Sequence, residues 1–203
     1  MRWLRWTDAL LLAFIGLAIV VGLAPLNLVD LSISLEVQRL EVGPLLRSVS
    51  WLGYWPKSLI VPIVVIVGLW AIRWRREAVL LAVTSIGAVA ICHIVRVLDP
   101  RARPGLPVHV EDIIRGSGFP SGHVMDYVAL CGFCIVILRH RKADLPAWSH
   151  TVLLAFLLAM IVLVGPSRIW LGAHWPTDVL GGYLLGGWWV TVMARLYRGA
   201  TWR

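Results

Sequence analysis

Long stretches of apolar sequence without a charged residue recur along this chain. Ala9–Val29 contains no Asp, Glu, Lys or Arg, and neither does Leu145–Ser167. A helix that crosses a membrane needs about 20 mostly apolar residues, because the hydrocarbon offers its backbone no water to bind. Apolar residues make up 59% of the sequence and charged residues 15%, which excludes a disordered chain and almost any water-soluble globule. The sequence therefore predicts an integral membrane protein of the all-α class.

Six apolar stretches predict a polytopic protein with six transmembrane helices, in a single domain over residues 1–203. They are Ala9–Val29, Ser58–Ile72, Ala78–Val95, Val124–Leu138, Leu145–Ser167 and Val179–Ala194. The fourth stretch contains one acid, Asp126. The first is interpreted as a retained anchor, because Met1–Asp8 has too few basic residues for a signal peptide and no small-residue cleavage pattern precedes the next span.

Lys and Arg are concentrated in alternate connections between these stretches. With the N-terminus inside the cell, eleven of the nineteen fall in short inner segments: Arg2, Arg5, Arg73, Arg75, Arg76, Arg139, Arg141, Lys142, Arg195, Arg198 and Arg203. Cytoplasmic loops are enriched in these residues, so both termini are predicted to be cytoplasmic. The net charge of +8 is thus mainly topological and does not predict nucleic-acid binding, although the inner segments could also bind anionic lipids.

Three connections lie on the outer side in this topology. Leu26–Trp55 includes Leu31–Val42, whose pattern fits either an interfacial amphipathic helix or an irregular loop. Asp99–Pro120 is rich in Pro, Gly and Arg and is predicted to be a loop. Pro166–Pro176 is predicted to be a short turn.

Residues that bind anions gather in and beside the last two connections. Three arginines, Arg96, Arg103 and Arg168, reach the same outer face, and a guanidinium fits phosphate or carboxylate oxygens in bidentate fashion. Pro120-Ser121-Gly122-His123 adds the start of a helix, with Ser121 as a possible cap. Free N–H groups and the helix dipole make such a terminus an anion site. Two anion-binding devices on one face indicate a phosphate.

Two histidines on this face can supply the chemistry. A neutral imidazole can attack phosphorus, and an imidazolium can deliver a proton. His174 and Asp178 are four residues apart and would share one face if this stretch is helical. A carboxylate on one ring nitrogen would leave the other free as a nucleophile. His123 would then protonate the leaving oxygen.

The order and spacing of these residues resemble the signature of the type 2 phosphatidic acid phosphatase superfamily, which also includes vanadium haloperoxidases. That signature is Lys-x6-Arg-Pro, then Pro-Ser-Gly-His, then Ser-Arg-x5-His-x3-Asp. Here the blocks are Arg96-x6-Arg103-Pro104, Pro120-Ser121-Gly122-His123, and Ser167-Arg168-x5-His174-x3-Asp178. The last two blocks match in full. In the first, Arg96 stands where the family usually has Lys, which keeps the charge but alters the geometry offered to phosphate.

The resemblance covers residues 96–178 and implies a membrane-bound lipid phosphatase that works without a metal or other cofactor. It implies that His174 is the nucleophile, Asp178 its partner and His123 the general acid. The phosphate would be held by Arg96, Arg103, Ser121, Gly122, His123 and Arg168. The order of the two histidines rests more on the resemblance than on their spacing.

Several other polar residues are given structural interpretations. Arg101 and Arg115 are predicted to contact lipid headgroups, as basic residues at the ends of spans usually do. A metal site is disfavoured, because zinc needs three or four converging ligands and the arginines would repel a cation. Asp126 has two open interpretations. It accepts a hydrogen bond from His123 or an arginine, or it has a structural role, buried as a neutral acid or in contact with another helix.

The sequence thus predicts a hydrolase at the outer face of the plasma (inner) membrane, with a lipid phosphate and the bilayer as its partners. Polyprenyl diphosphate is the favoured substrate. Phosphatidylglycerophosphate or phosphatidic acid comes second, and lipid A phosphate third. The alternative reaction is phosphotransfer, in which a sugar or lipid hydroxyl attacks the same phosphohistidine instead of water.

Overall fold

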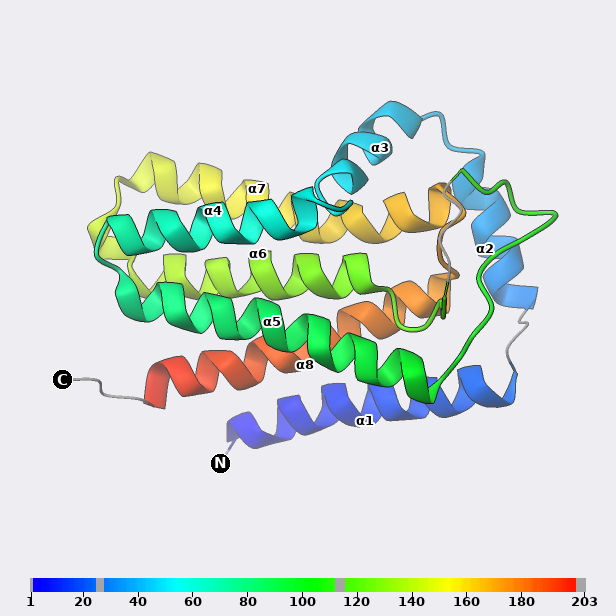
Figure 1. Cartoon of the computed structure of the whole chain (residues 1–203), viewed down its shortest axis with the longest axis horizontal. Coiled ribbons are helices and arrows are strands. Elements are labelled where there is room, and N and C mark those ends of the chain that lie inside the picture. Colours follow the sequence, from blue (N-terminus) through cyan, green and yellow to red (C-terminus); the bar gives the residue numbers. More distant parts are fainter. Residues whose placement is uncertain (1, 25–27, 112–115, 200–203) are drawn as a thin grey trace.

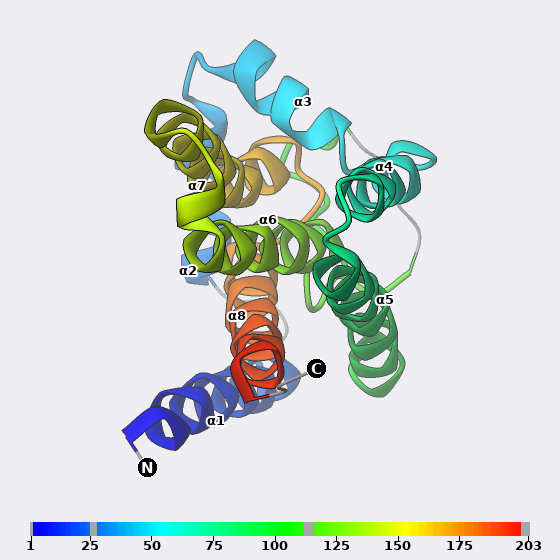
Figure 2. The same ribbon diagram turned by 90° about the vertical axis from the view of Figure 1, so that its left-hand side faces the viewer.

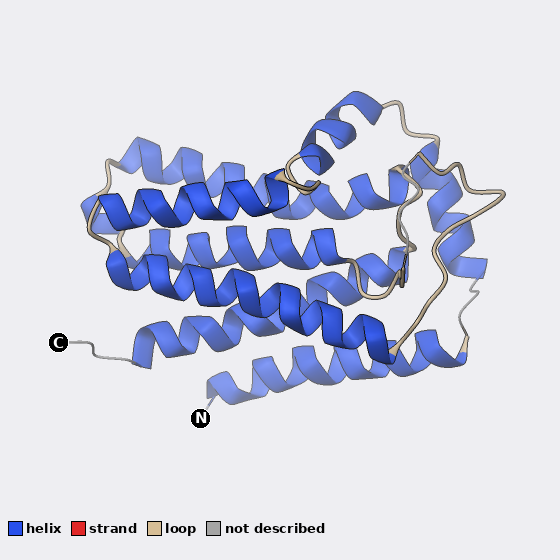
Figure 3. Cartoon of the chain, in the orientation of Figure 1, coloured by secondary structure: helices blue, strands red, loops and turns tan. Residues whose placement is uncertain are grey.

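The computed structural model describes residues 2–24, 28–111 and 116–199, and within these ranges the regular structure is helical, with no strand (Figure 3). The elements are α1 (Arg2–Leu23), α2 (Leu28–Gln38), α3 (Gly43–Trp51), α4 (Lys57–Ala71), α5 (Arg75–Leu98), α6 (Gly122–His140), the short 3-10 helix η1 (Lys142–Asp144), α7 (Ala147–Trp170) and α8 (Pro176–Gly199). The prediction of an all-α chain is confirmed.

Helices α1 and α4–α8 occupy the six stretches predicted to cross the membrane. In the described ranges α5–α8 are each long and apolar enough to span a bilayer, whereas α4 is apolar but has 15 residues. The predicted first span, Ala9–Val29, is too long. Helix α1 ends at Leu23, and α2 starts at Leu28 in a direction that differs by 101°, while residues 25–27 lie outside the described part.

Helix α6 lies at the centre of the bundle and packs against α5, α7 and α8, while α1 packs on α8 (Figure 2). Gly182 on α8 permits a close approach to α6, because a Cβ atom there would lie 2.8 Å from the carbonyl oxygen of Ser121. Large side chains such as Leu12, Ile86 and Val162 are exposed on the outside of the bundle, as expected for a surface that faces lipid. The close α6–α8 contact holds the starts of both helices together.

The connections between the helices divide between two ends of the bundle (Figure 1). The first turn of α1, the last turn of α8 and the α4–α5 and α6–α7 connections lie at one end. Helix α2, the described residues of the segment 99–121 (99–111 and 116–121) and the turn 171–175 lie at the other. The three sequence blocks therefore meet at one end of the bundle.

Two of the predicted connections differ in detail from the structure. Leu31–Val42 is helical as far as Gln38, as part of α2, and this decides between helix and loop for most of its length. The predicted turn Pro166–Pro176 starts too early, because α7 continues through Pro166 to Trp170. Membrane helices tolerate an internal proline when neighbouring groups satisfy the backbone, and here the Tyr183 hydroxyl accepts a hydrogen bond from the Gly165 N–H at 3.0 Å.

Candidate active site

The residues of the three sequence blocks come together from several elements at one end of the bundle. Arg96 lies on the last turn of α5, Arg103 in the segment 99–121, Ser121 at the N-cap of α6, Gly122 and His123 on its first turn, Arg168 on the last turn of α7, His174 in the turn before α8, and Asp178 on the first turn of α8. The loop predicted for Asp99–Pro120 is free of helix and strand in its described residues, so Arg103 is carried by irregular backbone.

His174 and Asp178 face each other at the start of α8. Nδ1 of His174 lies 3.5 Å from Oδ2 of Asp178, and both side chains are buried. The two residues do not share one helix face, because α8 begins at Pro176 and His174 precedes it. The carboxylate instead folds back over the helix start, where Oδ2 also accepts a hydrogen bond from the Trp175 backbone N–H at 2.9 Å. The pair is therefore built by a capping arrangement.

Burial determines the charge of His174. It lowers the pKa of the imidazole to about 4, against the opposing effect of the Asp178 carboxylate. The charges of Arg103 and Arg168 make smaller contributions that also lower this pKa. His174 is therefore a neutral imidazole at pH 7, the form in which a ring nitrogen can attack.

Arg103 contacts the ring nitrogen of His174 that points away from Asp178. Its Nη1 lies 3.1 Å from Nε2 of His174 and donates to the Ala173 carbonyl at 2.7 Å. Since a guanidinium has only donors, Nε2 must be the acceptor, and the ring proton is assigned to Nδ1, which faces Asp178. Burial and the charge of Arg96 lower the pKa of Arg103 to about 10, so it stays charged at pH 7.

Arg168 is fully buried and held by polar groups from α3 and the following loop. Its Nη1 donates to the Ser50 hydroxyl at 3.1 Å and to the Tyr54 hydroxyl at 2.9 Å, and its guanidinium lies 5.2 Å from the centre of the Tyr54 ring. Ser167 supports the same contact, with its hydroxyl 2.8 Å from that of Ser50. The segment before α4 therefore helps to hold Arg168, which the sequence pattern had placed only at the end of a membrane span.

The start of α6 is tied to α5 and α8 and carries polar atoms without partners. Arg96 Nε donates to the Pro120 carbonyl at 3.2 Å, and a Cβ atom at Gly122 would lie 2.7 Å from Nη2 of Arg96. The expected cap does not form, because the Ser121 hydroxyl makes no bond to the helix start. This hydroxyl and Nε2 of His123 are buried and have no hydrogen-bond partner in the described structure. Buried polar atoms of this kind need an explanation, and a ligand can supply one.

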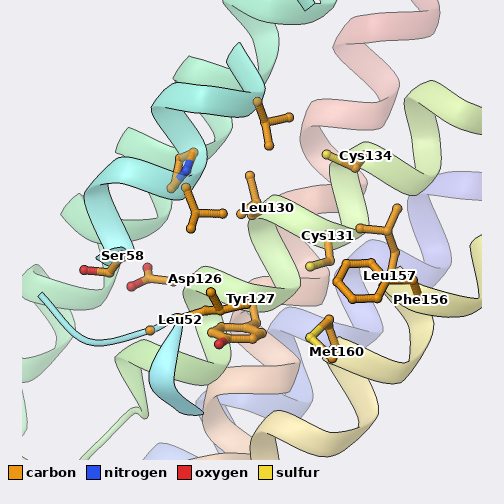
Figure 4. Close-up of a pocket in the computed structure, with 14 residues that line it drawn as sticks. Leu52, Ser58, Asp126, Tyr127, Leu130, Cys131, Cys134, Phe156, Leu157 and Met160 are labelled. Atoms are coloured by element: carbon orange, nitrogen blue, oxygen red, sulfur yellow. The ribbon is translucent and has the colours of Figure 1, made fainter. Parts of the chain in front are cut away.

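Asp126 lies on the wall of an apolar groove between α4, α6 and α7 (Figure 4). The groove has a volume of about 160 Å³ and is lined by side chains that include Leu130, Phe156, Leu157 and Met160, with Ser58 near its Asp126 end. Within the described ranges no hydrogen bond joins Asp126 to His123 or to an arginine. The structure thus does not show the hydrogen bond of the first interpretation, and Asp126 lines the groove.

The interpretation of Arg101 as a lipid-headgroup contact is also wrong. Its side chain is buried, donates to Asp178 Oδ1 at 2.5 Å and to Thr177 Oγ1 at 2.6 Å, and forms an ion pair with Asp30 Oδ2 at 2.7 Å. Sequence reasoning also missed Asp30. Its signal was an acid just after the long uncharged stretch Ala9–Val29, where it would be costly without a partner. Arg115 lies outside the described residues.

The site is dominated by positive charge from Arg96, Arg103 and Arg168. In the described residues no group of three His, Cys, Asp or Glu side chains is arranged to hold a metal ion. The donor set is instead a cluster of guanidinium groups around a buried histidine, which suits an anion with several oxygens.

Fold and site together define a multi-pass helical membrane protein with an arginine-lined histidine site at one end. The chain belongs to the PAP2 superfamily, whose family model matches residues 77–202. It is 30% identical over 136 residues to phosphatidylglycerophosphatase B of Bacillus subtilis, across 64% of this chain and 63% of that protein. It is 27% identical over 122 residues to undecaprenyl-diphosphatase of Sulfolobus acidocaldarius, across 57% and 53%.

A solved structure has the same fold. The crystal structure of a transmembrane PAP2-type phosphatidylglycerolphosphate phosphatase from Bacillus subtilis superposes with a TM-score of 0.79, at 23% identity, over 97% of this chain and 98% of that one. In the comparisons with phosphatidylglycerophosphatase B and undecaprenyl-diphosphatase, the chain spans less than two thirds of each relative's own length.

Proposed function

We propose that this chain is a lipid phosphatase that works through a phosphohistidine on His174. The observation that carries the proposal is the buried His174 ring, which contacts Asp178 at one nitrogen and Arg103 at the other. Such a ring is neutral, has a defined tautomer, and directs its lone pair at a group that binds phosphate. A histidine that only filled the core would not need a guanidinium on its acceptor nitrogen.

The reaction takes place in two steps. Nε2 of His174 attacks phosphorus, so that an N–P bond forms while the P–O bond to the lipid breaks. His123, as the imidazolium that the negative charge of the bound phosphate favours, donates its proton to the leaving oxygen and becomes neutral. Asp178 stabilises the positive phosphorylated ring through the Nδ1 proton. Water, which gives a proton back to His123, then attacks phosphorus, and inorganic phosphate leaves with His174 neutral again.

The phosphoryl oxygens are bound by the arginines and the start of α6. Arg96, Arg103 and Arg168 neutralise the charge that spreads over these oxygens, as a metal ion would in other phosphatases. The buried Ser121 hydroxyl and His123 Nε2 gain partners when the phosphate and its leaving oxygen are bound. In this scheme the reaction needs neither a metal nor a cofactor.

The apolar groove supports a lipid as the substrate. Gly53 lines the groove and packs closely on His123, since a Cβ atom at Gly53 would lie 2.3 Å from its ring. A lipid tail in the groove would therefore place its phosphate next to the site. We favour polyprenyl diphosphate, because its tail carries no polar group and one relative is an undecaprenyl-diphosphatase. Phosphatidylglycerophosphate, phosphatidic acid and lipid A phosphate are the alternatives, as is transfer to a second hydroxyl.

The orientation follows from the distribution of basic residues. Arg73, Arg75 and Arg141 belong to the end of the bundle opposite the site, together with the first turn of α1 and the last turn of α8. By the positive-inside rule we place this end, and both termini, in the cytoplasm and the site at the outer face of the plasma membrane. Residues 1–203 are then one membrane-embedded domain.

Phosphate release by the purified protein in detergent micelles with EDTA tests the proposal. Polyprenyl diphosphate, phosphatidylglycerophosphate, phosphatidic acid and lipid A are each compared with the His174→Ala variant. We expect turnover in EDTA that is lost in the variant, with polyprenyl diphosphate ranked first. Turnover that survives in His174→Ala would rule out the phosphohistidine, and release only when a hydroxyl acceptor is added would indicate transfer.

A further inference from the structure

Arg101 bridges two buried carboxylates behind the His174–Asp178 pair. One end of its guanidinium donates to Asp178 Oδ1 at 2.5 Å and the other binds Asp30 Oδ2 at 2.7 Å. The Arg101, Asp30 and Asp178 side chains are at most 2% exposed. Asp30 comes from α2, and Arg101 from the irregular segment 99–121, so two elements outside the α5–α8 core converge on one catalytic carboxylate.

Asp30 also holds the start of α8 directly. Its Oδ1 accepts the Thr177 backbone N–H at 2.9 Å, and its Oδ2 accepts the Thr177 hydroxyl at 2.7 Å. The Thr177 hydroxyl is in turn 2.6 Å from Nη1 of Arg101. The position of Asp178 is thus determined by its neighbour in the helix as well as by Arg101.

We infer that Arg101 and Asp30 are positioning residues that hold the Asp178 carboxylate with Oδ2 directed at His174. This inference rests on the proposed function, because it needs His174 as the nucleophile. With Oδ1 bound by Arg101 and Oδ2 bound by the Trp175 N–H, the carboxylate can rotate only by breaking a buried hydrogen bond. Such bonds are costly to leave unmade.

The charges of the three side chains give this arrangement a second consequence. Asp30, Arg101 and Asp178 together carry one net negative charge behind the imidazole. Removing Arg101 leaves two negative charges there, and neutralising Asp30 leaves none. The other charged or titratable groups that act on His174 and Asp178 are Arg103 and Asp99 from the segment 99–121, Arg168 from α7 and His123 from α6. These four groups are unchanged when Arg101 or Asp30 is substituted.

The test is the pH profile of kcat/KM for phosphate release in micelles, measured for Arg101→Met, Asp30→Asn and the double variant. We expect Arg101→Met to lower kcat/KM by about 100-fold, because a reacting group is displaced. We also expect its acid limb to move to higher pH by about one unit, because two carboxylates stabilise the imidazolium. Asp30→Asn, which keeps one acceptor oxygen for the Thr177 backbone N–H, should move the limb to lower pH. The double variant should return it toward the wild-type position.

Two controls separate positioning from stability. Arg101→Lys keeps one charge but cannot bridge both carboxylates, so it should recover only part of the lost activity. Arg141→Met breaks the ion pair of Arg141 with the buried Glu77 (2.7 Å) at the opposite end of the bundle. It should lower the melting temperature without moving the acid limb.

The outcomes are distinct. Opposite shifts of the acid limb in Arg101→Met and Asp30→Asn support the inference. If His174→Ala is inactive but the acid limb moves in neither Arg101→Met nor Asp30→Asn, the inference is overturned while the proposed function stands. If Arg101→Met does not fold, Asp30→Asn alone decides by the direction of its shift. Activity that survives in His174→Ala overturns both.

Discussion

Nη1 of Arg103 lies 3.1 Å from Nε2 of His174, so the side chain that we propose binds phosphate contacts the atom that we propose attacks it. The same guanidinium is held by the carbonyls of Gly116, Ser117 and Ala173. A phosphate that displaces the His174 contact would keep Arg103 as a partner for its own oxygens. Attack and charge neutralisation are then performed from one anchored position.

Arg103→Lys is expected to lower kcat/KM by roughly 100- to 1,000-fold, the usual effect of losing one oriented donor to a transition state. A lysine carries the charge but cannot reach three carbonyls and a phosphate at once. Steady-state phosphate release measures the effect. Arg39→Lys, which alters an exposed ion pair with Glu36, is the matched control and should behave as wild type. Near-normal activity of Arg103→Lys would show that charge alone is needed.

Asp178→Asn is expected to lower kcat by about 10,000-fold, because an amide can hold the neutral ring in the wrong tautomer. The buried His174 would then present an N–H group to phosphorus instead of a lone pair. Rapid quenching with a radiolabelled lipid phosphate should trap an acid-labile label on the wild-type protein and none on His174→Ala. If the acid-labile label formed on Asp178→Asn at the wild-type rate, this result would contradict the role of the carboxylate.

The acid limb of kcat/KM for His174 is expected near pH 4 and not near the ordinary histidine value of 6.5, since burial lowers the pKa of this residue to about 4. The ring attacks only when neutral, so activity should persist at pH 5 and fall as the pH drops through 4. The free energy of unfolding should also fall at low pH. The neutral buried ring stabilises the fold above pH 6.5, and this contribution is lost as the pH falls toward 4. A limb near pH 6.5 would show that His174 is solvated.

The helices at the six predicted stretches, and the meeting of the three sequence blocks at one end of the bundle, could be predicted because both depend on local patterns. Apolar stretches define the helices, and the fixed spacing of His174 and Asp178 brought them together even though His174 lies outside α8. Arg101 was misread because a basic residue after a span usually reaches lipid headgroups. Its two carboxylate partners are 71 and 77 residues away, a distance along the chain over which no local pattern operates.

Asp126→Asn is expected to leave the pH profile of kcat/KM unchanged, because the residue makes no hydrogen bond to His123 in the described structure and lines the groove instead. The measurement is the same phosphate release from pH 4 to pH 9. A displaced limb would restore the idea that Asp126 supports catalysis.

Met160→Trp is expected to raise KM for a long-chain lipid phosphate roughly tenfold, because a larger side chain overfills the groove that we assign to the lipid tail. For a short, water-soluble phosphate ester, which needs no groove, kcat/KM should stay unchanged. Val162→Trp on the exposed side of the same helix is the matched control, since its side chain faces lipid. Equal losses on both substrates would place the effect on the fold, and no change on either would show that the tail binds elsewhere.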